Sequence, residues 1–148
     1  ARVTLLSFEG GPAMKHHSGY RTWRALAAWC ALLLLAFING AAREAWLEHH
    51  FDEETAHVLG TLLLCVWILA AVWWLAPWLR IATERQALRT GLAWVALTLA
   101  AESLVGHYLL GQPWSALLDG ADLKDGHIWP LVLIVTAVSP WLAWRGRR

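Results

Sequence analysis

Cysteine is scarce in this chain, and the motifs of the common enzyme classes are missing. The two cysteines, Cys30 and Cys65, lie in different apolar segments, and about 10 Å of helical rise separates their expected depths. A disulfide needs Cα atoms within about 7 Å, so we expect none, and no CxxC pair offers a redox or zinc site. The sequence also has no glycine-rich phosphate loop, no HExxH and no plausible nucleophile with a base. We therefore expect no enzyme.

Charged residues are equally sparse. Only 16% of the 148 residues are charged, 58% are hydrophobic, and the net charge is +1. Such a chain has no basic stripe for nucleic acid. The mixture is typical of an integral membrane protein, so the lipid bilayer is the predicted partner. The twelve tryptophans agree with this interpretation, because indole rings favour the headgroup layer.

Four apolar segments stand out, each near the roughly 20 residues that a helix needs to cross a bilayer. They are Ala25 to Ala42, Val58 to Leu79, Gly91 to Leu110 and Ile128 to Trp144. Their apolar runs are continuous, which favours helices over the alternating strands of a β-barrel. Because the connections are short, consecutive segments should be antiparallel neighbours. The predicted fold is all-α, an integral membrane four-helix bundle with up-down-up-down order.

The distribution of lysine and arginine predicts the orientation. Most of them flank the first segment, the connection between the second and third segments, and the C-terminus: Arg2, Lys15, Arg21, Arg24, Arg80, Arg85, Arg89, Arg145, Arg147 and Arg148. Arg43 and Lys124 lie in the other two connections, which are rich in Asp and Glu. By the positive-inside rule, both termini are cytoplasmic. The expected location is the bacterial inner membrane, with an acidic outer face.

The expected domain organisation has three parts. Residues 1 to 24 form a leader and a cytoplasmic flank. The part before Met14, the single methionine, is neither apolar enough for a signal peptide nor periodic enough for a helix, so we expect it to be a leader, a cloning remnant or a mis-assigned start. Residues 25 to 144 form the transmembrane domain, and residues 145 to 148 form a basic cytoplasmic tail.

One carboxylate, Glu102, interrupts the third apolar segment, on the order of 12 Å below the outer interface. Thr98 lies one turn before it on the same face, and Asn39 and Arg43 share a face at the outer end of the first segment. We expect a buried polar cluster of these four residues, with an Arg43–Glu102 ion pair. Three roles stay open: a structural clasp, a proton relay or ligand site, and a protonated Glu102 that faces a neighbouring subunit.

Further polar side chains gather at the outer ends of the segments. The candidate contributors to the same site are Glu44, His57, His107, Trp114 and His127. Histidines at one level on several helices are what a haem or metal site needs. His107, however, should point about 140° away from Glu102 on a helix, so the two do not share a neighbour. We predict no resident cofactor or metal, and keep a haem or metal site as an alternative.

Several stretches carry a resemblance. NGAARE, EETAHVLGTL, GLAWVALTLAAESLVGHYLLGQPWSALL and DGHIWPLVLIVTAVSP extend from about Asn39 to Pro140. Together they resemble a family of uncharacterised small bacterial inner-membrane proteins with four spans. The most specific part comprises Glu102, Gly106, His107 and Trp114. The resemblance implies the four-helix fold and the bacterial inner membrane, but it assigns no catalytic residue because that family has no established activity. Where the family pattern has Gly-Arg, this chain has Gly126 and His127.

Three functions are compatible with these features. The first is a non-enzymatic accessory or scaffold subunit that packs against a larger inner-membrane complex or against copies of itself, with the tryptophans as anchors. The second is a small proton-coupled carrier or a periplasmic-side ligand-binding protein that uses Glu102. The third is a haem or metal protein. The sequence favours the first, because it contains no catalytic or cofactor motif.

Overall fold

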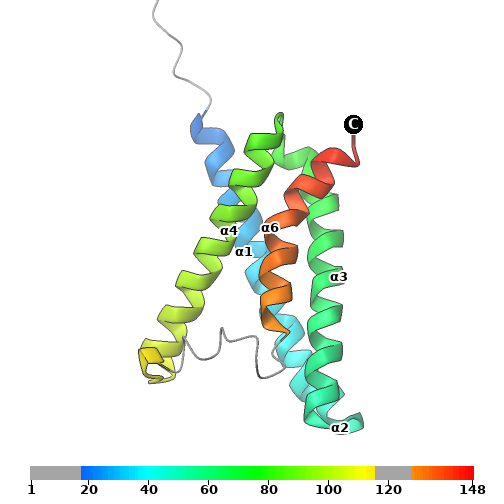
Figure 1. The fold of residues 1–148 in the computed structure, drawn as a ribbon, viewed down its shortest axis with the longest axis vertical. Coiled ribbons are helices and arrows are strands. Elements are labelled where there is room, and N and C mark those ends of the chain that lie inside the picture. Colours follow the sequence, from blue (N-terminus) through cyan, green and yellow to red (C-terminus); the bar gives the residue numbers. More distant parts are fainter. Residues whose placement is uncertain (1–17, 116–127) are drawn as a thin grey trace, which may run out of the picture.

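The computed structural model describes residues 18–115 and 128–148, and every regular element in these ranges is helical (Figure 1). The four long helices are α1 (Ser18–Ala42), α3 (Glu53–Leu79), α4 (Glu84–Leu104) and α6 (Trp129–Arg145). Three short elements extend two of them: the π-helix η1 (Arg43–Leu47), α2 (Glu48–His50) and the π-helix η2 (Val105–Leu109). The predicted all-α fold is confirmed for these ranges.

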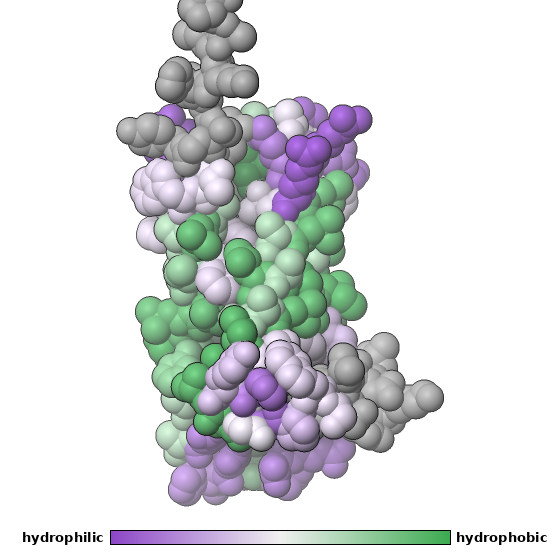
Figure 2. All heavy atoms as spheres, turned by 90° about the vertical axis from the view of Figure 1, so that its left-hand side faces the viewer, coloured by the Kyte–Doolittle hydropathy of each residue, from purple (hydrophilic) through white to green (hydrophobic). Residues whose placement is uncertain are grey.

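Three helical stretches are long and apolar enough to cross a membrane: Thr22–His50, Glu53–Leu79 and Glu84–Leu109. Figure 2 shows an apolar band across the middle of the molecule, with polar surface at both ends. Large apolar side chains cover the outside of this band, and in water their exposure would be costly. These features together suggest a membrane protein. Helix α6 is also apolar, but it has only 17 residues.

The helix boundaries follow from local chemistry. Asp52 caps α3, because its Oδ2 accepts the backbone N–H of Thr55 over 3.0 Å. Thr83 caps α4 in the same way, with its Oγ1 accepting the backbone N–H of Gln86 over 3.3 Å. Helix α3 ends at Leu79, as predicted, where Arg80 adopts the left-handed conformation. The first helix differs more from the prediction: it begins at Ser18 and stays helical through η1 and α2 as far as His50.

Helix α6 lies between α3 and α4 and packs against both, whereas α1 packs mainly against α3 and has little contact with α4. The core consists of Ala28, Leu32, Ile68, Val72, Leu79, Trp94 and Ala143. A Cβ atom on Gly91 would lie 1.9 Å from the carbonyl oxygen of Ala137, so α4 and α6 meet backbone to backbone at this glycine. Trp94 is only 1% exposed and donates to the carbonyl of Ala25 over 2.8 Å. This tryptophan is therefore a core residue and not a headgroup anchor.

The two ends of the molecule carry opposite charge. The start of α1, the α3–α4 connection and the C-terminus lie at one end (Figure 1). We call it the basic end, because its described part contains Arg21, Arg24, Arg80, Arg85, Arg89, Arg145, Arg147 and Arg148. The opposite end, which includes η1, α2 and the start of α3, contains Glu44, Glu48, Asp52, Glu53 and Glu54. We call it the acidic end.

Candidate functional site

A cavity of about 210 Å³ lies between the four long helices, towards the acidic end. We call it the outer cavity. Its apolar wall consists of Leu32, Leu33, Ala36, Leu64, Ile68 and Val132. Its polar wall consists of Trp29, Asn39, Arg43, His57, Thr61, Thr98, Glu102, Trp129 and Thr136. The structure therefore places all four residues of the predicted polar cluster around one space.

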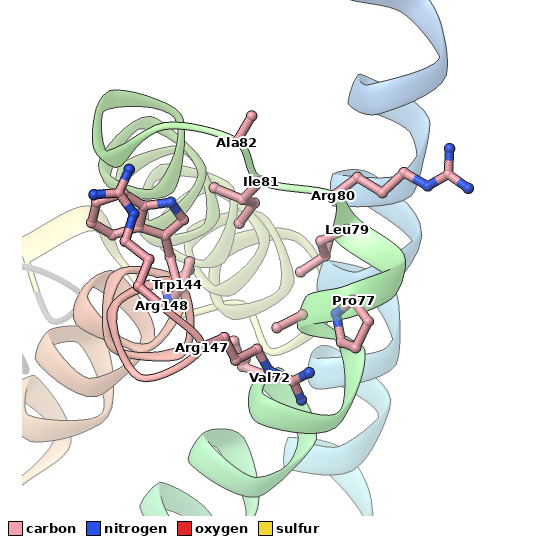
Figure 3. Close-up of a pocket in the computed structure, with 12 residues that line it drawn as sticks. Val72, Pro77, Leu79, Arg80, Ile81, Ala82, Trp144, Arg147 and Arg148 are labelled. Atoms are coloured by element: carbon pink, nitrogen blue, oxygen red, sulfur yellow. The ribbon is translucent and has the colours of Figure 1, made fainter.

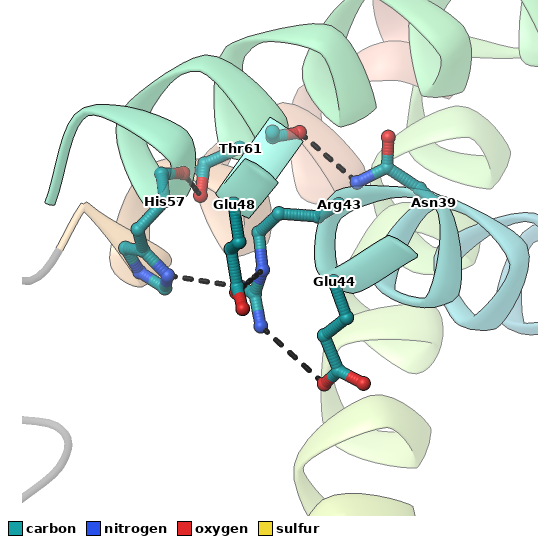
Figure 4. A network of polar contacts seen from close by, with 7 residues as sticks. Asn39, Arg43, Glu44, Glu48, His57 and Thr61 are labelled. Atoms are coloured by element: carbon teal, nitrogen blue, oxygen red, sulfur yellow. Dashed lines mark hydrogen bonds and ion pairs between the residues drawn. The ribbon is translucent and has the colours of Figure 1, made fainter. Parts of the chain in front are cut away.

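Arg43 is the centre of a polar network at one side of the cavity (Figure 4). Its guanidinium Nη1 lies 2.9 Å from Nδ1 of His57, Nη2 lies 3.9 Å from Oε1 of Glu44, and Nε lies 3.5 Å from Oε1 of Glu48. Because arginine can only donate, Nδ1 of His57 accepts, which places the proton of a neutral ring on Nε2. The predicted Arg43–Glu102 ion pair is therefore wrong. The helix continues beyond the first span, so its own carboxylates remain within reach of the guanidinium.

The other predicted member on α1, Asn39, faces the next helix. Its Nδ2 donates to the carbonyl oxygen of Gly60 over 3.0 Å (Figure 4). A Cβ on Gly60 would lie 3.1 Å from Cδ of Arg43, so the missing side chain gives the arginine room to cross α3. One turn away, the hydroxyl of Thr61 donates to the carbonyl of His57 over 2.9 Å. The Asn39–Gly60 bond joins α1 to α3 at this depth, whereas the Thr61–His57 bond lies within α3.

Glu102 has a different partner from the one predicted. Its Oε1 accepts the indole N–H of Trp129 over 3.2 Å, which links α4 to α6. On the same face of α4, the hydroxyl oxygen of Thr98 accepts the indole N–H of Trp29 over 3.1 Å. Glu102 is also exposed in the isolated chain, whereas Asn39 and Thr98 are partly buried. The prediction of a buried cluster is wrong at this residue, because α4 diverges from α1 toward the acidic end (Figure 1).

The two indoles were missed by the sequence argument, which treated tryptophans as membrane anchors. A signal for one of them was present: Trp129 lies at the outer end of the last apolar segment, on the same side of the bilayer as Glu102. Indole is a donor without an acceptor, and a buried indole N–H needs a partner. A carboxylate below the outer interface needs a donor, and the indole N–H of Trp129 was a candidate for that role.

The remaining candidate residues fall in different places. His107 does not line the outer cavity: its Nδ1 lies 2.9 Å from the carbonyl oxygen of Gln112, and its ring stacks on Trp114 with centroids 4.3 Å apart. Glu44 is a highly exposed partner of Arg43 at the rim. His127 lies outside the described residues. Within residues 18–115 and 128–148, no three His, Cys, Asp or Glu side chains form a group suited to a metal ion.

The outer cavity combines one carboxylate with neutral hydrogen-bonding groups and apolar side chains. Within the described chain, Glu102 forms no ion pair, since the cation of Arg43 is engaged by Glu44 and Glu48. Leucine, isoleucine and valine side chains also line the cavity, together with the indoles of Trp29 and Trp129, and the indole of Trp129 bonds to the carboxylate. Neither serine nor cysteine is among the lining residues. The arrangement offers a hydrogen-bond acceptor with negative charge beside an apolar and aromatic surface.

Comparison of the chain with protein-family models, with curated proteins and with solved structures gives no match. The resemblance to small bacterial four-span membrane proteins stays a prediction, and the function has to be argued from the site.

Proposed function

We propose that this chain is a non-enzymatic, four-span protein of the bacterial inner membrane. In this proposal its outer cavity binds a small molecule with an apolar body and a cationic or hydrogen-bond-donating head group. The observation that carries the proposal concerns Glu102, which lies within the membrane-capable stretch Glu84–Leu109 and lines the outer cavity. Its carboxylate has no cationic partner among the described residues. A proton-coupled carrier, the alternative function, would use the same Glu102 carboxylate to bind and release a proton.

The charge of Glu102 needs a partner at this depth. A carboxylate without one costs several kcal/mol in hydrocarbon, so intramembrane ionisable residues are candidates for function. The bond from Trp129 supplies one neutral donor, and a carboxylate has further lone pairs to fill. A ligand with an ammonium or several N–H groups would supply both the hydrogen bonds and the charge.

The size and wall of the cavity limit the ligand further. Pockets for drug-sized ligands span roughly 300 to 1,000 Å³, and the outer cavity is smaller at about 210 Å³. Leucine and isoleucine side chains on one wall would bury a short alkyl chain or ring, and the indole rings of Trp29 and Trp129 favour a cation. We therefore expect a small amphiphile, or the head and first carbons of a longer one.

The proposal also includes a topology: α6 is the fourth span, and the basic end of the molecule lies in the cytoplasm. Helix α6 is apolar and packs between α3 and α4, which supports the proposal that it is a fourth span beside them. The arginines of the basic end favour the cytoplasm by the positive-inside rule. In inverted vesicles, a maleimide that cannot cross the membrane should label Arg148→Cys in a Cys30→Ala, Cys65→Ala background. It should not label Glu54→Cys in that background, and the reverse pattern would overturn the orientation.

Calorimetric titration of the purified protein with short alkylammonium ions tests the ligand class, and alkylcarboxylates of equal length serve as the control ligands. Loss of a charged hydrogen bond costs about 1.5–3 kcal/mol, so Glu102→Gln should weaken alkylammonium binding by roughly 10- to 100-fold. Glu54→Gln, which removes an exposed carboxylate of the acidic end that does not line the cavity, should leave binding unchanged. Equal binding by the Glu102→Gln protein, or a preference for carboxylates, would overturn the proposal.

A second candidate function is the accessory subunit. The outer part of α4 and η2 stands away from α1 and exposes apolar side chains: Leu104, Val105, Tyr108, Leu109 and Leu110. Tyr108 is 71% and Leu109 78% exposed, which suits contact with a helix of another membrane protein as well as with lipid. A basic side chain of that helix would then be the partner of Glu102. Stoichiometric co-purification of a second membrane protein, lost on Leu109→Lys, would support this role.

A further inference from the structure

A second pocket lies at the basic end, between the C-terminal parts of α3 and α6 and the α3–α4 connection (Figure 3). Its volume is about 340 Å³. We call it the basic pocket. The residues that line it are Val72, Ala76, Pro77, Leu79, Arg80, Ile81, Ala82, Pro140, Ala143, Trp144, Arg147 and Arg148. Its inner wall is thus apolar, and its charged residues are all arginines.

The charge around this pocket is strongly one-sided. Within residues 18–115 and 128–148, the basic end has eight arginines, and Glu84 is its only Asp or Glu. Glu84 accepts the indole N–H of Trp141 over 2.9 Å. No hydrogen bond or ion pair of the Arg80 or Arg148 side chain occurs among residues 18–115 and 128–148. Two guanidinium groups at the pocket therefore have donors to offer an anion.

Tryptophans hold the arginines at a defined level. Arg148 lies over the ring of Trp144 at 4.4 Å from its centroid, and Arg147 lies over Trp73 at 5.2 Å. Two further pairs, Arg24 with Trp78 and Arg145 with Trp141, occur at the same end. Indoles favour the headgroup layer, and a guanidinium that stacks on an indole lies at the level of the lipid phosphates.

The backbone of Arg80 gives independent support. Its φ of 50° makes it the one described non-glycine residue with positive φ, at the position after a helix where glycine is preferred. An arginine there carries backbone strain that a glycine would avoid, and such strain clusters at functional sites. The strained arginine forms part of the pocket wall.

We infer that the basic pocket binds the headgroup of an anionic phospholipid. Figure 3 shows that the side chain of Arg80 points outward from the end of α3 at one rim of the pocket, while Arg148 lies beside Trp144 at the opposite side. Charges spread in this way suit a broad headgroup better than a single phosphate ion, which needs donors that converge on one point. The apolar floor then leads the acyl chains on to the lipid-facing surfaces of α3 and α6. Basic pockets between membrane helices recognise anionic lipids in this way.

This inference goes beyond the proposed function. The basic pocket lies at the opposite end of the molecule from Glu102, and its lining shares no residue with the outer cavity. A failed test of the lipid site would therefore leave the proposed ligand site at Glu102 unaffected, and the reverse also holds.

The test is native mass spectrometry of the purified full chain after incubation with equal amounts of phosphatidylglycerol and phosphatidylcholine. We expect retained phosphatidylglycerol, and about a tenfold weaker apparent affinity for it in the Arg80→Gln, Arg148→Gln protein. The Arg85→Gln, Arg89→Gln protein is the matched control: it loses the same charge from exposed residues of the same end that do not line the pocket. The control should retain the lipid, as should Arg80→Lys, Arg148→Lys.

Three results would overturn the inference. Equal loss of lipid in both glutamine proteins would show general attraction to a basic surface. Equal retention of the two lipids by the unmodified chain would show no headgroup recognition. Displacement of the lipid by millimolar inorganic phosphate would show a site for the free anion. Gel filtration and circular dichroism of each variant separate loss of the lipid from loss of the fold.

Discussion

The indole N–H of Trp129 donates to Oε1 of Glu102 over 3.2 Å and thereby joins α6 to α4, across 27 positions of sequence. Three further indole bonds involve α4: Trp29 to Thr98, Trp94 to the carbonyl of Ala25, and Trp141 to Glu84. Tryptophans therefore tie α4 to its neighbours at several depths. In an apolar setting such bonds replace the interhelical ion pair that the sequence suggested.

The Trp129–Glu102 bond predicts a coupled pair. Trp129→Phe removes the donor and Glu102→Leu removes the acceptor, and the free energies of unfolding of both variants and of the double variant are measured in detergent. A double-mutant cycle should return a coupling of about 0.5–1.5 kcal/mol, or up to about 3 if the carboxylate is ionised. Trp114→Phe is the control, since Trp114 stacks on His107 and stacking survives the change. A coupling near zero for Trp129 and Glu102 would mean that the bond does not form.

Arg43 and Glu102 should behave as independent residues. The guanidinium of Arg43 is engaged by Glu44, Glu48 and His57, so the effects of Arg43→Gln and Glu102→Gln on thermal unfolding should add to within about 0.5 kcal/mol. The Arg43→Gln, Glu48→Gln cycle should instead show coupling. A stronger coupling between Arg43 and Glu102 than between Arg43 and Glu48 would contradict this independence and support the ion pair predicted from the sequence.

Two glycines predict opposite effects of the same substitution. At Gly91, a Cβ would lie 1.9 Å from the carbonyl oxygen of Ala137, so alanine must push α4 and α6 apart. We expect Gly91→Ala to cost about 1–3 kcal/mol or more. At Gly40, no atom lies within 4 Å of the added Cβ, and Gly40→Ala should stabilise α1 by about 0.5–1 kcal/mol. Thermal unfolding of both variants checks this, and equal effects would contradict the α4–α6 contact.

Asp52 predicts a weak loss of stability in acid. The backbone N–H of Thr55 donates to its carboxylate and lowers the pKa of Asp52 below its ordinary value of 3.8. A carboxyl with a depressed folded pKa stabilises the fold above its unfolded pKa, and this contribution disappears as the pH falls below about 4. In Asp52→Asn the side-chain oxygen can still accept the backbone N–H of Thr55, but the side chain has no ionisable group. Its unfolding temperature should therefore fall less between pH 6 and about pH 3 than that of the unmodified chain. A steeper fall in Asp52→Asn would contradict the assignment.

The elements of the fold were within reach of the sequence, because continuous apolar runs with charged flanks admit few structures other than membrane helices. The shared cavity was also predictable: Asn39 and Arg43 lie one turn apart, as do Thr98 and Glu102, and both pairs were expected near the acidic end. The partners of these residues were not. The π-helical turn that begins at Arg43 changes the register of its neighbours, and π-turns have no clear sequence signal.

Tryptophan was the other source of error. The same ring can anchor at a headgroup, fill a core or donate to a carboxylate, and composition does not distinguish these roles. Trp94 fills the core and Trp129 holds Glu102, while the tryptophans beside arginines at the basic end follow the membrane expectation. Which role each takes depends on how α4 and α6 pack, and that is fixed by the close contact at Gly91.

The most direct measurement is native mass spectrometry of the chain and of its Glu102→Gln variant, both purified gently from native membranes, with every bound species identified. The account predicts a small molecule that bears an amine or several hydrogen-bond donors, bound one to one in the unmodified chain and lost from the Glu102→Gln protein. A chain that carries no such molecule, or one whose bound molecule is retained in full by Glu102→Gln, would contradict the account.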